Sequence, residues 1–173
     1  MNIEGKICRL RALEPQDLDA MYNWENNIAT WRVSGTVAPF SRHILSRLID
    51  EQQYDIFATR QMRLVIEDIE SSNVVGAVDL FEYDPLNRRA GIGIIVDPKY
   101  RQQGFAHDAL CCVEKYGKVH LHLHQLWCST LSDNRASIKL FAKAGYQECG
   151  RRKDWIIENQ GPTDEILMQK ILE

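Results

Sequence analysis

The stretch Val96-Asp97-Pro98-Lys99-Tyr100-Arg101-Gln102-Gln103-Gly104-Phe105-Ala106 decides how this chain folds. It joins an apolar run, 90–96, that predicts a strand to a segment, 106–119, whose apolar residues recur at helical spacing. Such a helix start leaves backbone N–H groups without an intrahelical partner at the positive end of the helix dipole. Gly104 keeps a side chain away from a ligand there. The stretch therefore predicts an anion site, most naturally for phosphate, although a strand-turn-helix unit without a ligand is the alternative.

The segments around this turn predict an α/β arrangement on a mixed sheet that is antiparallel in its first half. Before the turn, the patterns indicate a strand over 3–13, a helix from Glu14, an irregular stretch over 26–40, a helix after Ser41 and strands over 63–69 and 74–81. After it, they indicate a strand over 125–131, a helix over 134–144 and strands over 146–157 and 164–171. No repeat or linker divides the chain, so we expect one domain over 1–173.

Composition excludes several classes of protein. The 173 residues carry a formal net charge of −3 and no block of Lys and Arg, which argues against a nucleic-acid partner. Five cysteines without C-x-x-C spacing favour a reduced, cytoplasmic setting. No run approaches the roughly 18 apolar residues of a membrane span, so no membrane association is expected.

Two motifs resemble those of one family. Arg101-x-x-Gly104-x-Ala106 is similar to the pyrophosphate turn of GNAT-superfamily N-acetyltransferases, whose ligand is acetyl-coenzyme A (acetyl-CoA). The segment from Asn134 to Tyr146, about 30 residues further on, resembles the second GNAT signature, N-x-x-(S/A)-x-x-x-(Y/F)-x-x-x-G-(F/Y). The resemblance implies the GNAT acyl-CoA N-acyltransferase fold over nearly the whole chain, with a mixed sheet of about six or seven strands and about four helices. It points to the branch that contains spermidine and ribosomal-protein N-terminal acetyltransferases.

The resemblance also assigns the cofactor site. It implies that acetyl-CoA lies between the strands at 90–96 and 125–131, and that a backbone N–H near Ile94 stabilises the oxyanion. The implied cofactor-binding residues are Ile94, Val96, Arg101, Gln102, Gln103, Gly104, Phe105, Ala106, Asn134, Ser137 and Phe141. Asn134 has an alternative role as the N-cap of the following helix.

Phe141 stands where many family members have a tyrosine that protonates the departing thiolate. A thiol with a pKa near ~8.5 leaves without much help, so an acid is useful but not obligatory. Tyr83, Tyr100, Cys128 or a water are substitutes among which the sequence does not choose.

The acceptor side is less defined. Glu82, at the end of a strand, is our candidate for the catalytic base or amine anchor, with Asp79 second, although a carboxylate at a strand end is often only solvated. Trp24, Glu25 and Trp31 stand where the family places the acceptor wall, and core packing is the alternative for the tryptophans. Gly91 and Gly93 either open the acceptor end of the cleft or mark a bulge.

Two further patterns predict no chemistry. His120, His122 and His124 alternate along the chain but lack cysteine or carboxylate ligands nearby, so we expect no metal there. Cys111 and Cys112 are read as packing residues of the helix.

The sequence thus predicts direct attack of a primary amine on acetyl-CoA in a ternary complex. The acceptor is a polyamine or other small amine, or a protein N-terminus. The alternative is a catalytically impaired CoA-binding sensor or interaction module, which Phe141 supports. A homodimer would form through the last two strands.

Overall fold

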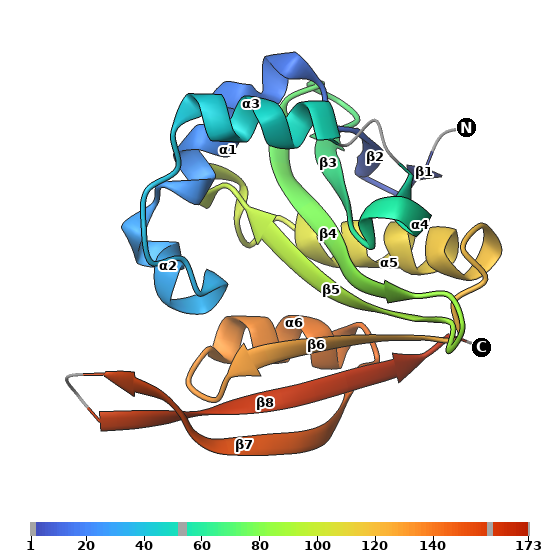
Figure 1. The fold of residues 1–173 in the computed structure, drawn as a ribbon. Helices are drawn as coiled ribbons and strands as arrows, with labels where there is room; N and C mark the ends of the chain where they lie inside the picture. The colour runs from blue at the N-terminus through green and yellow to red at the C-terminus, as the bar shows by residue number, and fades with distance from the viewer. Residues whose placement is uncertain (1–2, 52–54, 159–160, 173) are drawn as a thin grey trace.

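The computed structural model describes residues 3–51, 55–158 and 161–172, and its centre is an eight-stranded sheet in the order β1-β2-β3-β4-β5-β6-β8-β7 (Figure 1). The strands are β1 (Ile3–Glu4), β2 (Cys8–Ala12), β3 (Met62–Asp68), β4 (Val74–Asp84), β5 (Arg89–Val96), β6 (Gln125–Leu131), β7 (Gln147–Glu158) and β8 (Gly161–Ile171). The helices are α1 (Leu18–Glu25), α2 (Ile28–Ser34), α3 (Arg42–Glu51), α4 (Ile56–Thr59), α5 (Phe105–Val119) and α6 (Arg135–Lys143). Within the described ranges, no helix has both the length and the apolar character that a membrane span needs.

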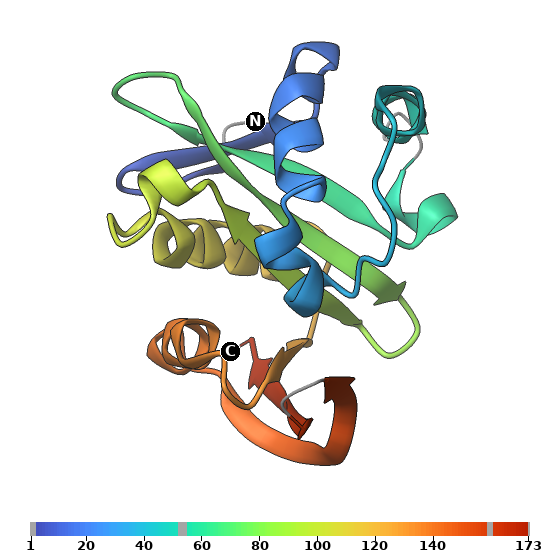
Figure 2. The ribbon, with the colours of Figure 1, turned by 90° about the vertical axis from the view of Figure 1, so that its left-hand side faces the viewer.

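Helices cover both faces of the sheet. Figure 2 shows α5 and α6 on one side and α1 and α3 on the other. The larger apolar cluster, which includes Ile92, Leu110 and Leu126, fills the space between the sheet and α5. A smaller cluster, which includes Met21, Leu45 and Val65, lies between the sheet and the helices α1 and α3. All strand pairs are antiparallel except β5 and β6, so the sheet is mixed.

The predicted fold class is confirmed, and the differences are local. The sheet has eight strands rather than about six or seven, because the first predicted strand is split into β1 and β2 by a turn. The six α-helices of the described residues exceed the expected four, because α2 forms in the stretch expected to be irregular and α4 precedes β3. Asn27 caps α2 by accepting a hydrogen bond from the Ala29 N–H (3.1 Å), and Gly35 ends it at a φ of 70°. Both are ordinary helix boundary signals that the sequence carries.

Candidate active site

The cleft forms where two parallel strands part. β5 and β6 pair only over Arg89–Gly91 and 125–127, and beyond these residues they diverge (Figure 1). The side of β5 that faces away from β4 therefore lacks a partner strand from Ile92 to Val96. An extended ligand can hydrogen-bond to such an edge as an added strand does. This is the place assigned to the pantetheine arm, beside Ile94 and Val96.

The turn after β5 fits a pyrophosphate group. Asp97 accepts a hydrogen bond from the Lys99 N–H (3.0 Å), and Arg101 Nε donates to the Val96 carbonyl (3.1 Å), which hold the turn in shape. Gln102 and Gly104 have φ angles of 62° and 97°. Among the described residues, no side chain caps the start of α5, so its first N–H groups remain for an anion.

Gln103, Phe105 and Ala106, which complete the turn and the helix start, differ in what they could offer a ligand. Gln103 turns its side-chain amide back to donate to the Lys99 carbonyl (3.0 Å), so it offers its backbone rather than its side chain to a ligand. Phe105 is buried and packs edge-on against Tyr100, with ring centroids 6.2 Å apart. Ala106 follows in the first turn of α5, where a small side chain leaves room above the helix end.

Asn134 does cap α6, since its Oδ1 accepts a hydrogen bond from the Ser137 N–H (3.2 Å). Its amide nitrogen has no partner in the described part of the chain, so capping and cofactor binding are compatible at this residue. Phe141 is only 3% exposed and packs edge-on against Tyr146, with ring centroids 5.0 Å apart. Its ring belongs to the core in this structure.

Beside Gly91 of β5, aromatic rings fill part of the space expected for the acceptor. Phe81 lies opposite Gly91, and a Cβ on Gly91 would meet the Phe81 ring at 2.3 Å. Gly91 is therefore required by this ring and does not open the cleft. Phe81 also packs edge-on against Trp127 of β6, with ring centroids 5.3 Å apart. Gly93, opposite Asp79, has no atom closer than 3.8 Å to an added Cβ and leaves space at the point of divergence.

Two of the predicted acceptor residues are joined by an arginine. Arg63 Nη1 lies 2.6 Å from Glu25 Oε1, and its Nε lies 2.7 Å from Asp79 Oδ1. Burial alone would lower the pKa of Arg63, but the two carboxylates outweigh it and raise that pKa. The charges of these three side chains sum to −1. The three residues line a pocket of about 310 Å³, whose walls comprise Leu13, Met21, Glu25, Phe40, Leu48, Gln61, Met62, Arg63, Asp79, Leu80 and Phe81.

Glu82 lies outside this pocket, at a bulge. The β4–β5 register shifts between Phe81 and Asp84, Glu82 adopts a φ of 48°, and its side chain is exposed. A positive φ is uncommon for a residue with a side chain, so this conformation lowers the stability of the fold locally.

The two predicted tryptophans have structural contacts. Trp24 is buried, and its indole N–H donates to Asp97 Oδ2 (3.2 Å). Trp31 is half-buried and donates to the Glu25 carbonyl (2.8 Å) at the end of α1. Both therefore hold α1 and α2 in place beside the cleft, and Trp24 offers little surface to an amine.

Of the three substitute acids in the chain, two are buried and one is partly exposed. Tyr83 and Cys128 are buried, and burial, together with Cys149, raises the pKa of Cys128 to about 12. Tyr100 is half-buried. His120, His122 and His124 are exposed along the loop before β6, and they do not form a metal-binding group with other described side chains.

Sequence reasoning missed Arg63 and Trp127. Arg63 has a signal, because antiparallel pairing of the predicted strands at 63–69 and 74–81 could bring it opposite Asp79, as observed. Trp127 has none, because its contact with Phe81 depends on how β5 and β6 part.

Two strands that part beside a helix start that no described side chain caps are the features expected of an acyltransferase that binds an acyl carrier in an extended form. A family model described as an acetyltransferase (GNAT) domain matches residues 8–147. Spermidine N(1)-acetyltransferase of Vibrio cholerae serotype O1 is 29% identical over 95% of this chain and 92% of its own length. The Escherichia coli K12 enzyme of the same name is 31% identical over 80% of this chain and 72% of its own.

Solved structures agree with the sequence relatives. The V. cholerae spermidine N-acetyltransferase in complex with CoA and spermine superimposes with a TM-score of 0.85, at 26% identity and with 95% of each chain covered. A dodecameric structure of the V. cholerae enzyme gives a TM-score of 0.78, at 26% identity, covering 95% of this chain and 94% of that one. The chain belongs to the GNAT acetyltransferase family. It is an acetyl-CoA-dependent N-acetyltransferase that acts on a primary amine.

Proposed function

We propose that the acceptor is a linear polyamine of the spermidine and spermine class. The observation that carries this is the pocket beside Gly93, which combines apolar walls with the net negative Glu25–Arg63–Asp79 group. A polyamine alternates methylene segments with ammonium groups, so it matches both features. The named activity of the V. cholerae and E. coli relatives supports the same acceptor.

For the cofactor, we propose that β5 and the turn after it hold acetyl-CoA. The free backbone edge at Ile94 and Val96 would pair with the pantetheine arm, and the residues 101–106 would hold the pyrophosphate through backbone N–H groups. The Asn134 amide nitrogen and Ser137 would contact the arm from α6. When bound, acetyl-CoA supplies the activated acetyl thioester.

For the chemistry, the amine must first lose a proton, because a primary ammonium has a pKa near ~10.4. We propose Glu82, exposed at its strained bulge, as the base or amine anchor, with Asp79 orienting the acceptor through its pairing with Arg63. The neutral nitrogen would then attack the thioester carbon, the C–S bond would break to release the thiolate, and the nitrogen would lose its second proton to solvent to give the amide. The Ile94 N–H would stabilise the oxyanion in between.

The leaving group departs without a tyrosine acid in this proposal. Phe141 is buried against Tyr146 and has no hydroxyl. Since a CoA-type thiol has a pKa near ~8.5, the thiolate is a tolerable leaving group close to neutral pH.

The test is thiol release from acetyl-CoA with spermidine, spermine, short monoamines and peptides that carry a free N-terminus. We expect turnover with the polyamines above the monoamines and peptides. Asp79→Asn should raise KM for spermidine, and Glu82→Gln should lower kcat, whereas Glu70→Gln, an exposed glutamate in the β3–β4 turn, should change neither. Faster turnover with peptides than with polyamines would reject the proposed acceptor.

One outcome would favour the alternative function. Tight CoA binding without turnover on any acceptor would support a CoA-binding module, and the structural feature behind it is Phe141 in the core. Activity restored by Phe141→Tyr would then identify the missing acid.

We also propose that the chain self-associates through β7 and β8. These strands form the end of the sheet beyond β6 (Figure 1), and β7 exposes Trp155 (53%) and Ile157 (76%). The dodecameric V. cholerae relative supports assembly in this family.

A further inference from the structure

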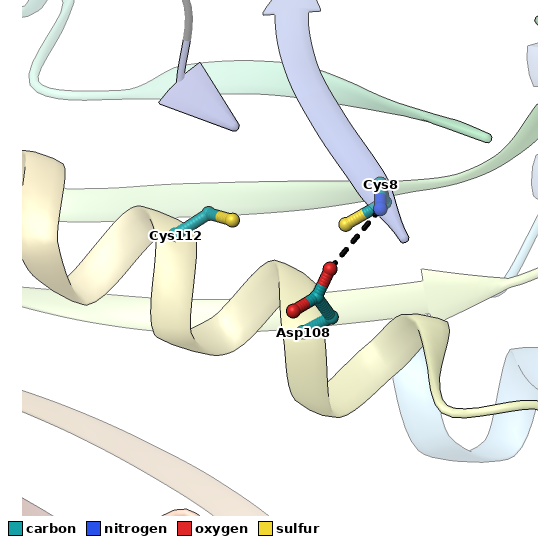
Figure 3. A group of neighbouring side chains, drawn as sticks. All are labelled: Cys8, Asp108 and Cys112. Atoms are coloured by element: carbon teal, nitrogen blue, oxygen red, sulfur yellow. Dashed lines mark hydrogen bonds between the residues drawn. The ribbon is translucent and has the colours of Figure 1, made fainter. Parts of the chain in front are cut away.

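Three metal-ligating side chains from distant parts of the chain meet beneath the β1–β2 turn. Cys8 comes from β2, and Asp108 and Cys112 lie one helical turn apart on the face of α5 that packs against β2. The two sulfur atoms and a carboxylate oxygen all lie within 4.8 Å of one another. Figure 3 shows the two thiols pointing toward each other with the Asp108 carboxylate beside Cys8. None of the three residues lines the pocket of the candidate active site.

The carboxylate is held in place by the backbone of the turn. Asp108 Oδ1 accepts a hydrogen bond from the Lys6 N–H (3.0 Å), while Oδ2 accepts from the N–H groups of Ile7 (2.8 Å) and Cys8 (3.0 Å). A carboxylate oxygen accepts along two lone-pair directions, so Oδ1 retains one. Hydrogen bonds from surrounding groups commonly hold a metal ligand in one orientation, and these three bonds fix the orientation of the Asp108 carboxylate in the same way.

The turn also covers the cluster closely. A Cβ on Gly5 would lie 2.3 Å from Asp108 Oδ2 and 2.7 Å from Cys112 Sγ, so only glycine lets the backbone pass here. Cys8 and Cys112 are 0% and 4% exposed. The site is therefore shielded from water, and an ion would enter by displacement of this short turn, in which Lys6 and Ile7 are exposed.

Charge favours a cation. Among the described residues, Asp108 makes no ion pair with a Lys, Arg or His side chain. Its charge is met only by backbone dipoles, and both neighbouring groups are thiols that become anionic on binding a metal. A divalent ion would compensate three anionic ligands better than any group now present.

The donor set selects the class of ion. Two thiolates and one carboxylate suit Zn²⁺ and similar borderline ions, whereas Mg²⁺ and Ca²⁺ require oxygen ligands. Around a tetrahedral zinc, neighbouring S and O ligands are separated by roughly 3.5 to 3.8 Å, given the usual bond lengths. Since the ligand atoms lie within 4.8 Å of one another, they need to approach by at most about 1.3 Å to reach that geometry.

We propose that Cys8, Asp108 and Cys112 bind a divalent ion of the zinc class, with water in the fourth position. Each thiol releases one proton as its sulfur–metal bond forms, so the reaction is M²⁺ plus two thiols giving a bis-thiolate complex and two protons. The ion joins β2 and the β1–β2 turn to α5, the helix that begins at Gly104. Its role is structural, and it strengthens the support of the pyrophosphate turn.

The test uses tag-free, reduced, chelator-treated protein titrated with Co²⁺ as a spectroscopic substitute for Zn²⁺. We expect a thiolate-to-cobalt charge-transfer band in the near ultraviolet that saturates at one equivalent and is displaced by Zn²⁺. Zn²⁺ should also raise the melting temperature. The Cys8→Ser and Cys112→Ser variants should lose the band and the shift.

The control uses the two exposed cysteines of the chain. Cys111 is exposed next to Cys112, and Cys149 is exposed on β7, so the Cys111→Ser, Cys149→Ser double variant should keep the full signal. This control stays informative if Cys8→Ser or Cys112→Ser fails to fold, because it leaves the proposed ligands intact. No band in the native protein, a band that persists in a folded Cys8→Ser variant, or loss of the band in the double variant would each overturn the proposal.

Discussion

Gly104 is the residue at which an unusual backbone conformation and the proposed cofactor site coincide. Its φ of 97° is outside the range that side-chain-bearing residues readily adopt. A Cβ there would lie 3.5 Å from Ile7 Cδ1, an ordinary contact. The requirement for glycine is therefore conformational, and in the proposed site a side chain would also stand where the pyrophosphate is expected to approach.

We expect Gly104→Val to weaken CoA binding at least about tenfold, equal to about 1.4 kcal/mol, and to lower the free energy of unfolding by about 1–2 kcal/mol. Calorimetry with CoA and denaturant unfolding would measure both. The matched control is Gly161→Val, since Gly161 has a φ of 114° and an added Cβ there would meet no atom of a non-adjacent described residue within 4 Å. It should show a similar loss of stability with unchanged CoA affinity. Equal loss of affinity in both variants would contradict this account.

Asp17 is a buried charge that a single arginine supports. Its carboxylate accepts hydrogen bonds from Arg11 Nη1 (2.8 Å) and Nη2 (2.9 Å) and from the Glu14 N–H (2.9 Å). Burial would raise the pKa of Asp17, but these bonds outweigh it and the pKa is lowered. The stabilisation is therefore present above the unfolded-state pKa and is lost as the pH falls through the folded-state pKa.

We expect Asp17→Asn to lower the free energy of unfolding by about 2–3 kcal/mol near pH 7, as for a hydrogen bond between charged groups. The difference from the native protein should shrink below about pH 4, where Asp17 begins to protonate in the unfolded chain while it stays ionised in the folded one. Denaturant unfolding at several pH values measures this. Asp19→Asn is the control, because Asp19 pairs with Arg42 on the exposed surface and should cost about 0–1 kcal/mol. A difference that is constant with pH would contradict the assignment.

At the scale of elements, α2 links the part of the molecule that ends with β5 to the part that begins with β6. Arg32 on α2 donates to both carboxylate oxygens of Asp133 (3.0 and 2.8 Å), in the loop after β6, and to Thr163 Oγ1 of β8 (3.3 Å). Because β5 and β6 diverge, these two parts separate toward this side. The contact is therefore placed to set how far the cleft opens, next to Asn134.

We expect Arg32→Ala to change the free energy of unfolding by no more than about 1 kcal/mol, since both partners are partly exposed. It should raise KM for the acceptor by about tenfold or less while kcat changes less, because the acceptor wall is loosened. Steady-state kinetics would show this. Asp133→Ala should reproduce the effect, and Arg42→Ala, which breaks an exposed pair away from the cleft, should not. Additive effects in the Arg32 and Asp133 double variant would contradict a shared role.

At the scale of the whole molecule, the β7–β8 end of the sheet governs assembly in our proposal. Trp155 lies at a bulge between Arg152 and Ile156, with the Arg152 guanidinium 4.7 Å from its ring centroid. An exposed aromatic beside an exposed Ile157 is the kind of surface that protein interfaces bury.

We expect the native protein to be larger than a monomer by light scattering, and Trp155→Ser with Ile157→Ser to reduce its mass. Leu86→Ser, which changes an equally apolar exposed residue in the β4–β5 turn, is the control and should leave the mass unchanged. A monomeric native protein, or assembly that survives the double substitution, would reject this interface.

Sequence and structure agree most closely where chemistry is local. β6 occupies the predicted residues, and α5 and α6 begin within one residue of their predicted starts. Gly145 ends α6 at a φ of 93°, as its position after the helix indicated. These features depend on periodicity and on residues with special backbone freedom, which neighbours in the chain specify.

The acceptor side needed the tertiary structure. Glu25 and Asp79 were chosen as separate acids, but Arg63 joins them, and Trp24 fills the core while Trp127 stands at the cleft. Cys8 meets Cys112 across more than 100 residues of sequence. Such contacts depend on strand register and on which face a side chain takes, and periodicity along one segment does not specify either.

By itself, then, the sequence determined the family and the backbone of the turn for which we propose pyrophosphate binding, because these rest on short motifs whose backbone chemistry is local. Only the tertiary structure decided the shape and charge of the acceptor pocket, the compatibility of capping and binding at Asn134, and the thiol–carboxylate cluster. The physical reason is that each of these depends on side chains that long-range packing brings within a few ångströms.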